Sequence, residues 1–200
     1  MQIIVTGVAG FIGFNLSKLL LRKKNIKIIG LDNINSYYST KLKKDRIKEL
    51  RKSKNFVFKR VDITNRKKLE RVFNKKISLI INLAAQAGVR YSLVKPTEFV
   101  DNNITGFYNL IHLSNKFKIK KIIYASSSSI YGDSKNFPLT EKQIVNPKNV
   151  YALSKKVNED LASVFSNQYK IRFIGLRFFT VYGEWGRPDM FMMKYLNSCF

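Results

Sequence analysis

Three glycines spaced three residues apart constrain the fold of this chain more than any other feature. Gly7, Gly10 and Gly13 follow the short apolar run Gln2–Thr6, which is typical of a buried strand. Residues 12–20 then repeat apolar side chains at helical spacing. A strand that passes through a glycine turn directly into a helix is the opening unit of a doubly wound α/β fold.

Strand-like and helix-like segments alternate along the rest of the chain. Apolar, β-branched runs predict further strands at residues 26–31, 55–61, 77–83, 119–125 and 171–178. Helices are expected at residues 41–52, 66–73, 96–117 and 151–169, and a loop rich in Ser, Asn and Pro at 126–148. This alternation requires crossover connections, so it predicts a parallel sheet covered by helices on both faces. Ligands are expected at the carboxyl ends of the strands.

The composition excludes several classes of protein. Apolar residues make up 45% of the 200 residues, which is too many for a disordered chain. A single cysteine, Cys199, and a single histidine, His112, exclude a disulfide framework and a zinc cluster, so no metal site is expected. No apolar run approaches the roughly 18 residues of a membrane helix, and a secretory leader is not expected because the sequence starts directly with MQIIVTG. We therefore expect a cytoplasmic protein with no membrane partner.

The chain is strongly basic, with 37 Lys and Arg against 13 Asp and Glu and a formal net charge of +24. The cations occur as pairs on many separate segments, such as Lys23-Lys24 and Lys75-Lys76, with no single stripe and no interleaved aromatic residues. This scatter favours a compositional bias with solvated surfaces, so no nucleic-acid partner is expected. A basic nucleic-acid binder remains the weaker alternative.

The glycine turn is suited to a dinucleotide. The first glycine permits the tight turn, the second lets the backbone approach a pyrophosphate, and the third lets the helix pack closely on the strand. Unpaired N–H groups and the helix dipole then stabilise the anion. Asp32 ends the second predicted strand, where a carboxylate would hold the adenosine ribose hydroxyls and repel a 2′-phosphate. The pattern therefore favours NAD over NADP.

Tyr151 and Lys155 are the candidates for proton transfer. They are four residues apart and so share one helix face, which we expect to lie opposite the apolar stripe of Leu153, Val157 and Leu161. A phenol with a pKa near 10 needs help to ionise at neutral pH, and a nearby ammonium group supplies it. A serine from residues 126–129, directly after the fifth strand, could hydrogen-bond the same substrate hydroxyl.

Eight motifs together carry a resemblance to a known family. They are VTGVAGFIG (5–13), LDN (31–33), VDIT (61–64), NLAAQAGVRYS (82–92), DNNITG (101–106), YASSSSIYG (124–132), YALSK (151–155) and LRFFTVYGEWGRPDM (176–190). The sequence resembles the extended short-chain dehydrogenase/reductases, and among them the NAD-dependent nucleotide-sugar epimerases. AQAGVRYS, SSSSIYG and RFFTVYGEWGRPDM look most like the UDP-glucuronate 4-epimerases. The resemblance implies a Rossmann fold of the extended type.

The resemblance also implies roles for individual residues. Tyr151 would be the base, Lys155 its partner, and Ser127 the catalytic serine. The NAD site would comprise Gly7, Gly10, Phe11, Ile12, Gly13, Asp32, Asn33, Asp62, Ile63, Leu83, Ala84, Ala85, Gln86, Asn102, Ser126, Tyr151, Lys155 and Phe178. Contacts to the UDP-sugar would come from Arg90, Ser127, Ser128 and Thr180.

The serine run favours one reaction over its relatives. Related dehydratases and decarboxylases carry acidic residues where this chain has Ser128 and Ser129, so water elimination lacks an acid or base here. Epimerisation needs neither: hydride leaves C4, the 4-keto sugar turns over, and hydride returns to the other face. The resemblance thus implies conversion of UDP-glucuronate to UDP-galacturonate, with NAD unchanged at the end.

The resemblance also bears on domains and assembly. Residues 1–180 would form the NAD-binding Rossmann domain, and 181–200 the incomplete start of the substrate-binding region, whose C-terminal lobe is largely absent. Related enzymes dimerise through the helices corresponding to 96–117 and 151–169, so a homodimer is expected for the full-length protein. The alternative is a truncated, non-catalytic remnant that binds NAD without turnover.

Overall fold

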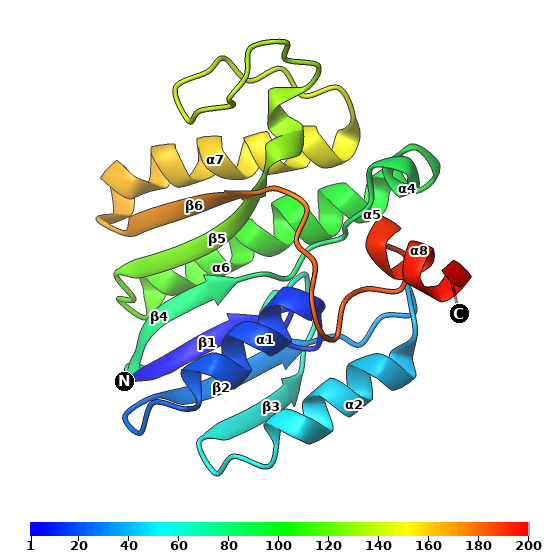
Figure 1. Ribbon diagram of the computed structural model, residues 1–200. Coiled ribbons are helices and arrows are strands. Elements are labelled where there is room, and N and C mark those ends of the chain that lie inside the picture. Colours follow the sequence, from blue (N-terminus) through cyan, green and yellow to red (C-terminus); the bar gives the residue numbers. More distant parts are fainter. Residues whose placement is uncertain (200) are drawn as a thin grey trace.

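All six predicted strands form one parallel sheet. The computed structural model describes residues 1–199, and Figure 1 shows the strands one above another, from β6 near the top to β3 near the bottom, with α1 in front of the sheet. The strands are β1 (Gln2–Thr6), β2 (Lys27–Asp32), β3 (Phe56–Arg60), β4 (Ile77–Asn82), β5 (Lys121–Ser127) and β6 (Arg172–Phe178). Their order is β3-β2-β1-β4-β5-β6, and every neighbouring pair is parallel. The predicted fold class is confirmed, with strand ends within two residues of those expected.

Helices cover the two faces of the sheet unequally. One face packs against α1 (Phe11–Leu20) and α2 (Thr40–Leu50), through a core that includes Phe14 and Ile47. The other packs against α3 (Arg66–Glu70), α6 (Gly106–Lys116) and α7 (Val150–Tyr169), through Phe107 and Leu110 among others. β1 and β4 are neighbours although β2 and β3 lie between them in sequence. Successive strands are therefore added on one side of β1 up to β3 and on its other side from β4 onward, and this switch in strand order opens a crevice at the carboxyl ends of β1 and β4.

The predicted helix at 96–117 is interrupted. It consists of α5 (Pro96–Phe99), a π-helical segment at Val100–Thr105 and α6. Two more helices, α4 (Val89–Val94) and α8 (Phe191–Cys199), and a 3-10 turn at Ser128–Tyr131 were not predicted. α4 and α8 expose many of their apolar side chains, so they lack the buried stripe by which a helix is recognised in a sequence.

The orientation expected for α7 is only partly correct. Leu161 packs against the core, but Leu153 of the same apolar stripe and Val164, which continues it, are exposed, and the buried positions include Ser154, Lys155 and Asn158. The polar face points inward because its side chains find hydrogen-bond partners on β5 and on the π-helical segment. Lys155 therefore lies inside the molecule, against the end of β5.

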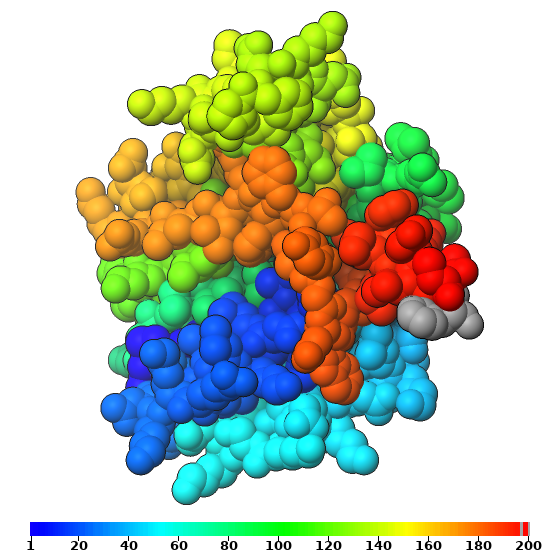
Figure 2. All heavy atoms as spheres, in the orientation of Figure 1, coloured from blue at the N-terminus to red at the C-terminus, as the bar shows by residue number. Residues whose placement is uncertain are grey.

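The segment between β6 and α8 runs back across the molecule. In Figure 2 residues 179–190 form an orange band in front of the N-terminal elements, with α8 beside it in red. Trp185 on this band packs on Phe14 of α1, with ring centroids 5.0 Å apart. The band thereby brings residues distant in sequence to the crevice.

Candidate active site

One cleft at the carboxyl edge of the sheet gathers the whole predicted site. Its volume is about 1030 Å³, at the upper end of the range for ligand pockets. It is lined by Gly7, Gly10, Phe11, Ile12, Gly13, Asp32, Asn33, Asp62, Ile63, Leu83, Ala84, Ala85, Gln86, Arg90, Asn102, Ser126, Ser127, Ser128, Tyr151, Lys155, Phe178 and Thr180. These are all the residues predicted for the site. The parallel strands deliver them to one place; their individual roles remain predictions.

The glycine loop is built so tightly that side chains are excluded. Gly7 adopts a left-handed conformation, with φ of 66°. A Cβ on Gly13 would lie 2.2 Å from the carbonyl oxygen of Gly7, well inside van der Waals contact. The loop thus brings the start of α1 against the end of β1, as predicted from the glycine spacing.

The N-terminus of α1 opens into the cleft without a competing anion. Its N-cap, Gly10, has no side chain to accept from the helix, and the first turn contains no acidic residue. The first N–H groups of the helix are therefore available to an anionic ligand, and the helix dipole favours one. This arrangement fits the pyrophosphate of a dinucleotide.

Two carboxylates follow the strands next to the glycine loop. Asp32 accepts hydrogen bonds from the backbone N–H groups of Ala9 at 3.0 Å and Ile34 at 2.8 Å, which ties the end of β2 to the loop. Burial raises the pKa of Asp32, and these hydrogen bonds only partly offset that effect. Asp62 accepts from the Asn33 side-chain amide at 2.8 Å. Both carboxylates line the side of the cleft where the ribose and adenine of NAD were expected.

A buried asparagine that the sequence did not reveal holds another wall of the cleft. Asn103 accepts from the Gln86 N–H at 2.7 Å and donates to the Gln86 carbonyl at 3.1 Å and to the Ser154 hydroxyl at 2.9 Å. Its predicted neighbour Asn102 lines the cleft and donates to the carbonyl of Glu98. Asn103 belongs to the π-helical segment, a type of irregularity often found at functional sites. No spacing in the sequence distinguishes these two asparagines.

Tyr151 and Lys155 both reach the cleft from α7. The Nζ of Lys155 donates to the carbonyl of Ala125 at 2.9 Å and lies 5.9 Å from the centre of the Tyr151 ring. Burial lowers the pKa of Lys155 to about 8. Burial also raises the pKa of Tyr151, against the effects of the Ser127 hydroxyl and the Arg187 charge. In the protein alone the phenol is therefore harder to ionise than the sequence argument assumed.

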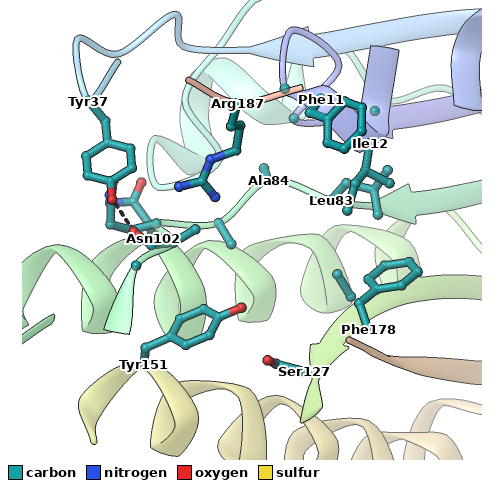
Figure 3. A pocket seen from close by; sticks show the side chains of 18 of the residues that line it. Phe11, Ile12, Tyr37, Leu83, Ala84, Asn102, Ser127, Tyr151, Phe178 and Arg187 are labelled. Atoms are coloured by element: carbon teal, nitrogen blue, oxygen red, sulfur yellow. Dashed lines mark hydrogen bonds between the residues drawn. The ribbon is translucent and has the colours of Figure 1, made fainter. Parts of the chain in front are cut away.

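The hydroxyl groups of Ser126 and Ser127 point in different directions. Ser126 donates to a carboxylate oxygen of Glu159 at 2.6 Å, and Glu159 is paired with Arg177 on β6 at 2.9 Å. Ser127 instead lies beside the cleft, where Figure 3 shows its hydroxyl opposite Tyr151. The hydroxyl of Ser126 is thus turned toward Glu159, whereas that of Ser127 hydrogen-bonds Ser129 at 3.2 Å and faces Tyr151 across the cleft.

A fully buried arginine fixes the band after β6 to the glycine loop. Arg46 of α2 donates to the Ala9 carbonyl at 2.8 Å and to the carbonyls of Trp185 at 2.5 Å and Gly186 at 3.3 Å. Its exposed fraction is 0%. Nothing in the sequence marked Arg46, since its partners are up to 140 residues away.

The band after β6 also places a positively charged side chain, Arg187, at the cleft. Arg187 lies over the rings of Tyr37 and Tyr38, at 5.6 and 5.9 Å from their centres, and is paired with Asp189 at 2.5 Å. Figure 3 shows Arg187 between Tyr37 and Phe11. Arg187 and the predicted Arg90 both line the cleft.

The chain is similar in sequence to proteins of a known family. A model of the NAD dependent epimerase/dehydratase family matches residues 3–199. Protein CapI from Staphylococcus aureus is 47% identical over 200 residues, 99% of this chain and 59% of that protein. The UDP-glucuronate 4-epimerase of Thermodesulfobacterium geofontis is 44% identical over 196 residues, 97% of this chain and 60% of that protein.

The fold is also similar to that of solved epimerase structures. The UDP-glucuronic acid 4-epimerase from Bacillus cereus, crystallised with UDP-glucuronic acid and NAD, superposes with a TM-score of 0.91 at 34% identity, covering 100% of this chain and 63% of that one. The chain spans about 60% of the length of these relatives. The resemblance inferred from the motifs is confirmed, and the prediction of NAD agrees with the family's description.

Proposed function

Since the chain belongs to the NAD dependent epimerase/dehydratase family, we propose that the natural protein epimerises a UDP-sugar at C4, with NAD as cofactor. We further propose UDP-glucuronate as the substrate and UDP-galacturonate as the product. The observation that carries this proposal is the meeting of Tyr151, Lys155 and Ser127 with the glycine loop in one cleft.

The residues proposed to hold NAD lie around the glycine loop and the neighbouring carboxylates. The glycine loop and the N-terminus of α1 would hold the pyrophosphate, and Asp32 and Asn33 the adenosine ribose. Asp62 and Ile63 would lie beside the adenine, and Lys155 would hold the nicotinamide ribose. When bound, NAD supplies a reversible hydride acceptor and a positive charge next to the phenol of Tyr151.

The protein's own groups would handle the proton. Tyr151 would accept the proton of the C4 hydroxyl and later return it, and Ser127 would hold the same oxygen by a hydrogen bond. Lys155 is held by the Ala125 carbonyl, with its Nζ near the Tyr151 ring. Its ammonium charge would favour the phenolate and oppose the effect of burial on the pKa of Tyr151.

The lining of the cleft favours a carboxylated sugar and no elimination. Arg90 would supply a cation for the sugar acid, and Ser128 and Thr180 would supply hydroxyl groups. The serine run at 126–129 contains no carboxyl group that could protonate a leaving water. Epimerisation without dehydration or decarboxylation is therefore the chemistry that these residues support best.

We assign residues 1–180 to the NAD-binding domain and 181–200 to the start of a substrate-binding region. We also propose a homodimer that packs α6 and α7 against their copies. Its basis is the exposure of large apolar side chains on these helices and on the π-helical segment before α6: Val100, Tyr108, Leu153 and Val164.

Conversion of UDP-glucuronate by the natural protein, compared with its Tyr151→Phe variant, tests this proposal. We expect UDP-galacturonate from the wild type and at least a 100-fold lower rate from the variant, which keeps its ring but has no proton to exchange. Tyr169→Phe, at the far end of the same helix, serves as control and should leave the rate unchanged. A Tyr151→Phe variant with full activity would refute the proposed base.

The same assay addresses the remnant alternative. If the wild type binds NAD but turns over no UDP-sugar offered, the protein is a non-catalytic NAD-binding relative. Activity on a different UDP-sugar would retain the epimerase and correct the substrate.

A further inference from the structure

The cations of the chain are gathered on the edge of the sheet opposite the cleft. Five connections return to the amino ends of β2 to β6. With the first residues of β2, β5 and β6 included, they cover residues 21–27, 51–55, 71–76, 117–121 and 170–172. Together they contain fifteen Lys or Arg and no Asp or Glu. In the sequence these residues look scattered, but parallel strands place every such connection at one edge. In Figure 1 this edge lies at the left, near the N-terminus.

The carboxyl edge has a different composition. Its segments at residues 33–39, 61–65, 83–88, 128–149 and 179–190 contain four Lys or Arg and five Asp or Glu. A uniform lysine bias would enrich both edges. The charge is therefore polarised along the strand direction, with its positive end away from the cleft.

All fifteen side chains are exposed, so their charges face solvent. Cations are favoured in the last turn of a helix, and each of these connections follows a helix C-terminus. That preference accounts for single residues near helix ends. It does not account for the pairs at 75–76 and 120–121, which directly precede or begin a strand.

We propose that this edge is a docking surface for an anionic lipid bilayer. Six strands spaced by about 4.8 Å make a surface about 24 Å wide, which is broad rather than grooved. Eleven of the fifteen cations are lysines, whose flexible ammonium groups suit a fluid array of phosphates. Docking in this way leaves the cleft, at the opposite edge, open to soluble ligands.

Nucleic acid is a poorer match for the same surface. The two aromatic residues in these five segments, Phe73 and Phe117, are not exposed, so they offer no platform for stacking bases. The helices present their C-termini here, so this edge lacks the N–H groups with which helix N-termini bind phosphates. In the described part of the chain no helix could cross a membrane, so the contact would be peripheral and sensitive to salt.

Co-sedimentation of the chain with lipid vesicles tests this proposal independently of the enzyme chemistry. The vesicles contain phosphatidylcholine alone or with about 30% phosphatidylglycerol, at about 50 and about 500 mM NaCl. We expect binding only to the anionic vesicles, lost at the higher salt concentration. Each cation near an anionic surface contributes about fivefold to partitioning, so removing six should lower it at least tenfold.

Two variants with the same net charge separate the edge from the overall charge. The edge variant changes six lysines to glutamine: Lys23, Lys24, Lys75, Lys76, Lys120 and Lys121. The control changes six other exposed lysines elsewhere: Lys41, Lys44, Lys67, Lys68, Lys135 and Lys142. Circular dichroism and thermal melting establish that both are folded.

We expect the tenfold loss in the edge variant and less than threefold loss in the control. Equal losses in the two variants would overturn an oriented surface. Absence of binding to anionic vesicles at low salt, or tighter binding to duplex DNA or RNA than to vesicles, would overturn the bilayer as partner.

Discussion

Replacing the buried lysine of the cleft by methionine should make the protein more stable at neutral pH. Lys155 is 3% exposed, and its Nζ donates to one carbonyl, that of Ala125. Burial of its ammonium charge lowers the pKa of Lys155 to about 8, from 10.5 for a solvated lysine. Methionine has a similar length and no charge, so it removes the cost of burial and keeps most of the packing.

The size of the effect follows from the shift in pKa. Each pKa unit corresponds to about 1.4 kcal/mol, so at pH 7 the buried charge costs about 3 kcal/mol of the free energy of unfolding. Losing the hydrogen bond to Ala125 costs about 1 kcal/mol. The Lys155→Met variant should therefore be more stable by about 2 kcal/mol, or about 4–8 °C in melting temperature for a chain of this size.

The pH dependence has a definite sign. Because the folded pKa lies below the unfolded one, the unfolded chain binds the proton more tightly, and the wild type gains stability as pH rises from about 8 to about 10.5. By pH 9.5 the wild type should have gained about 2 kcal/mol from this group, so the advantage of the variant should nearly disappear. Taking the difference between the two proteins cancels the other titrating groups.

Urea unfolding at pH 7 and pH 9.5, for the wild type and Lys155→Met, measures both quantities. Lys156→Met serves as control, because Lys156 is half-buried and paired with Asp160 at the surface, where an ion pair contributes less than about 1 kcal/mol. A Lys155→Met variant less stable than wild type at pH 7 by more than about 1 kcal/mol would refute the reasoning. So would a difference that does not change with pH.

Three further substitutions test other parts of the site. Gly13→Ala should weaken NAD binding at least 100-fold by calorimetry, because its Cβ would lie 2.2 Å from a loop carbonyl and displace the pyrophosphate cradle; unchanged affinity would contradict this. Arg46→Met should free the band after β6 and raise acrylamide quenching of Trp185, the single tryptophan, while Arg51→Met at the C-cap of the same helix should not; equal quenching in both would contradict the anchor. Asn103→Ala should lower the free energy of unfolding by about 2–3 kcal/mol, since it leaves a buried N–H and a carbonyl unpaired; a loss under about 0.5 kcal/mol in urea would contradict this.

The sheet and the cleft could be predicted because their signals are local. Buried strands are short apolar runs, and the glycine loop needs glycine for steric reasons that any neighbouring sequence shares. Once the strands are known to be parallel, their carboxyl ends bring Asp32, Ser127 and Phe178 to one edge. For that reason the residues predicted for the site all line one cleft, while their roles stay predictions.

What could not be predicted depends on contacts distant in sequence. Arg46 and Arg187 acquire their places only when the band after β6 folds back over α1 and α2, and no local pattern encodes that path. The inward face of α7 is polar because it meets partners on β5 and on the π-helical segment, so apolar periodicity pointed to the wrong side. The charged edge was missed for the same reason, since only the topology brings its five connections together.

The central claim is that the cleft supports reversible oxidation at C4 with Tyr151 as the base. Its most direct test is turnover of UDP-glucuronate carrying deuterium at C4 by the natural protein, with the product examined by NMR. We predict UDP-galacturonate that retains the deuterium, because hydride removed from C4 returns to the same carbon without exchange with water. UDP-galacturonate that carries hydrogen from solvent at C4 would contradict the account.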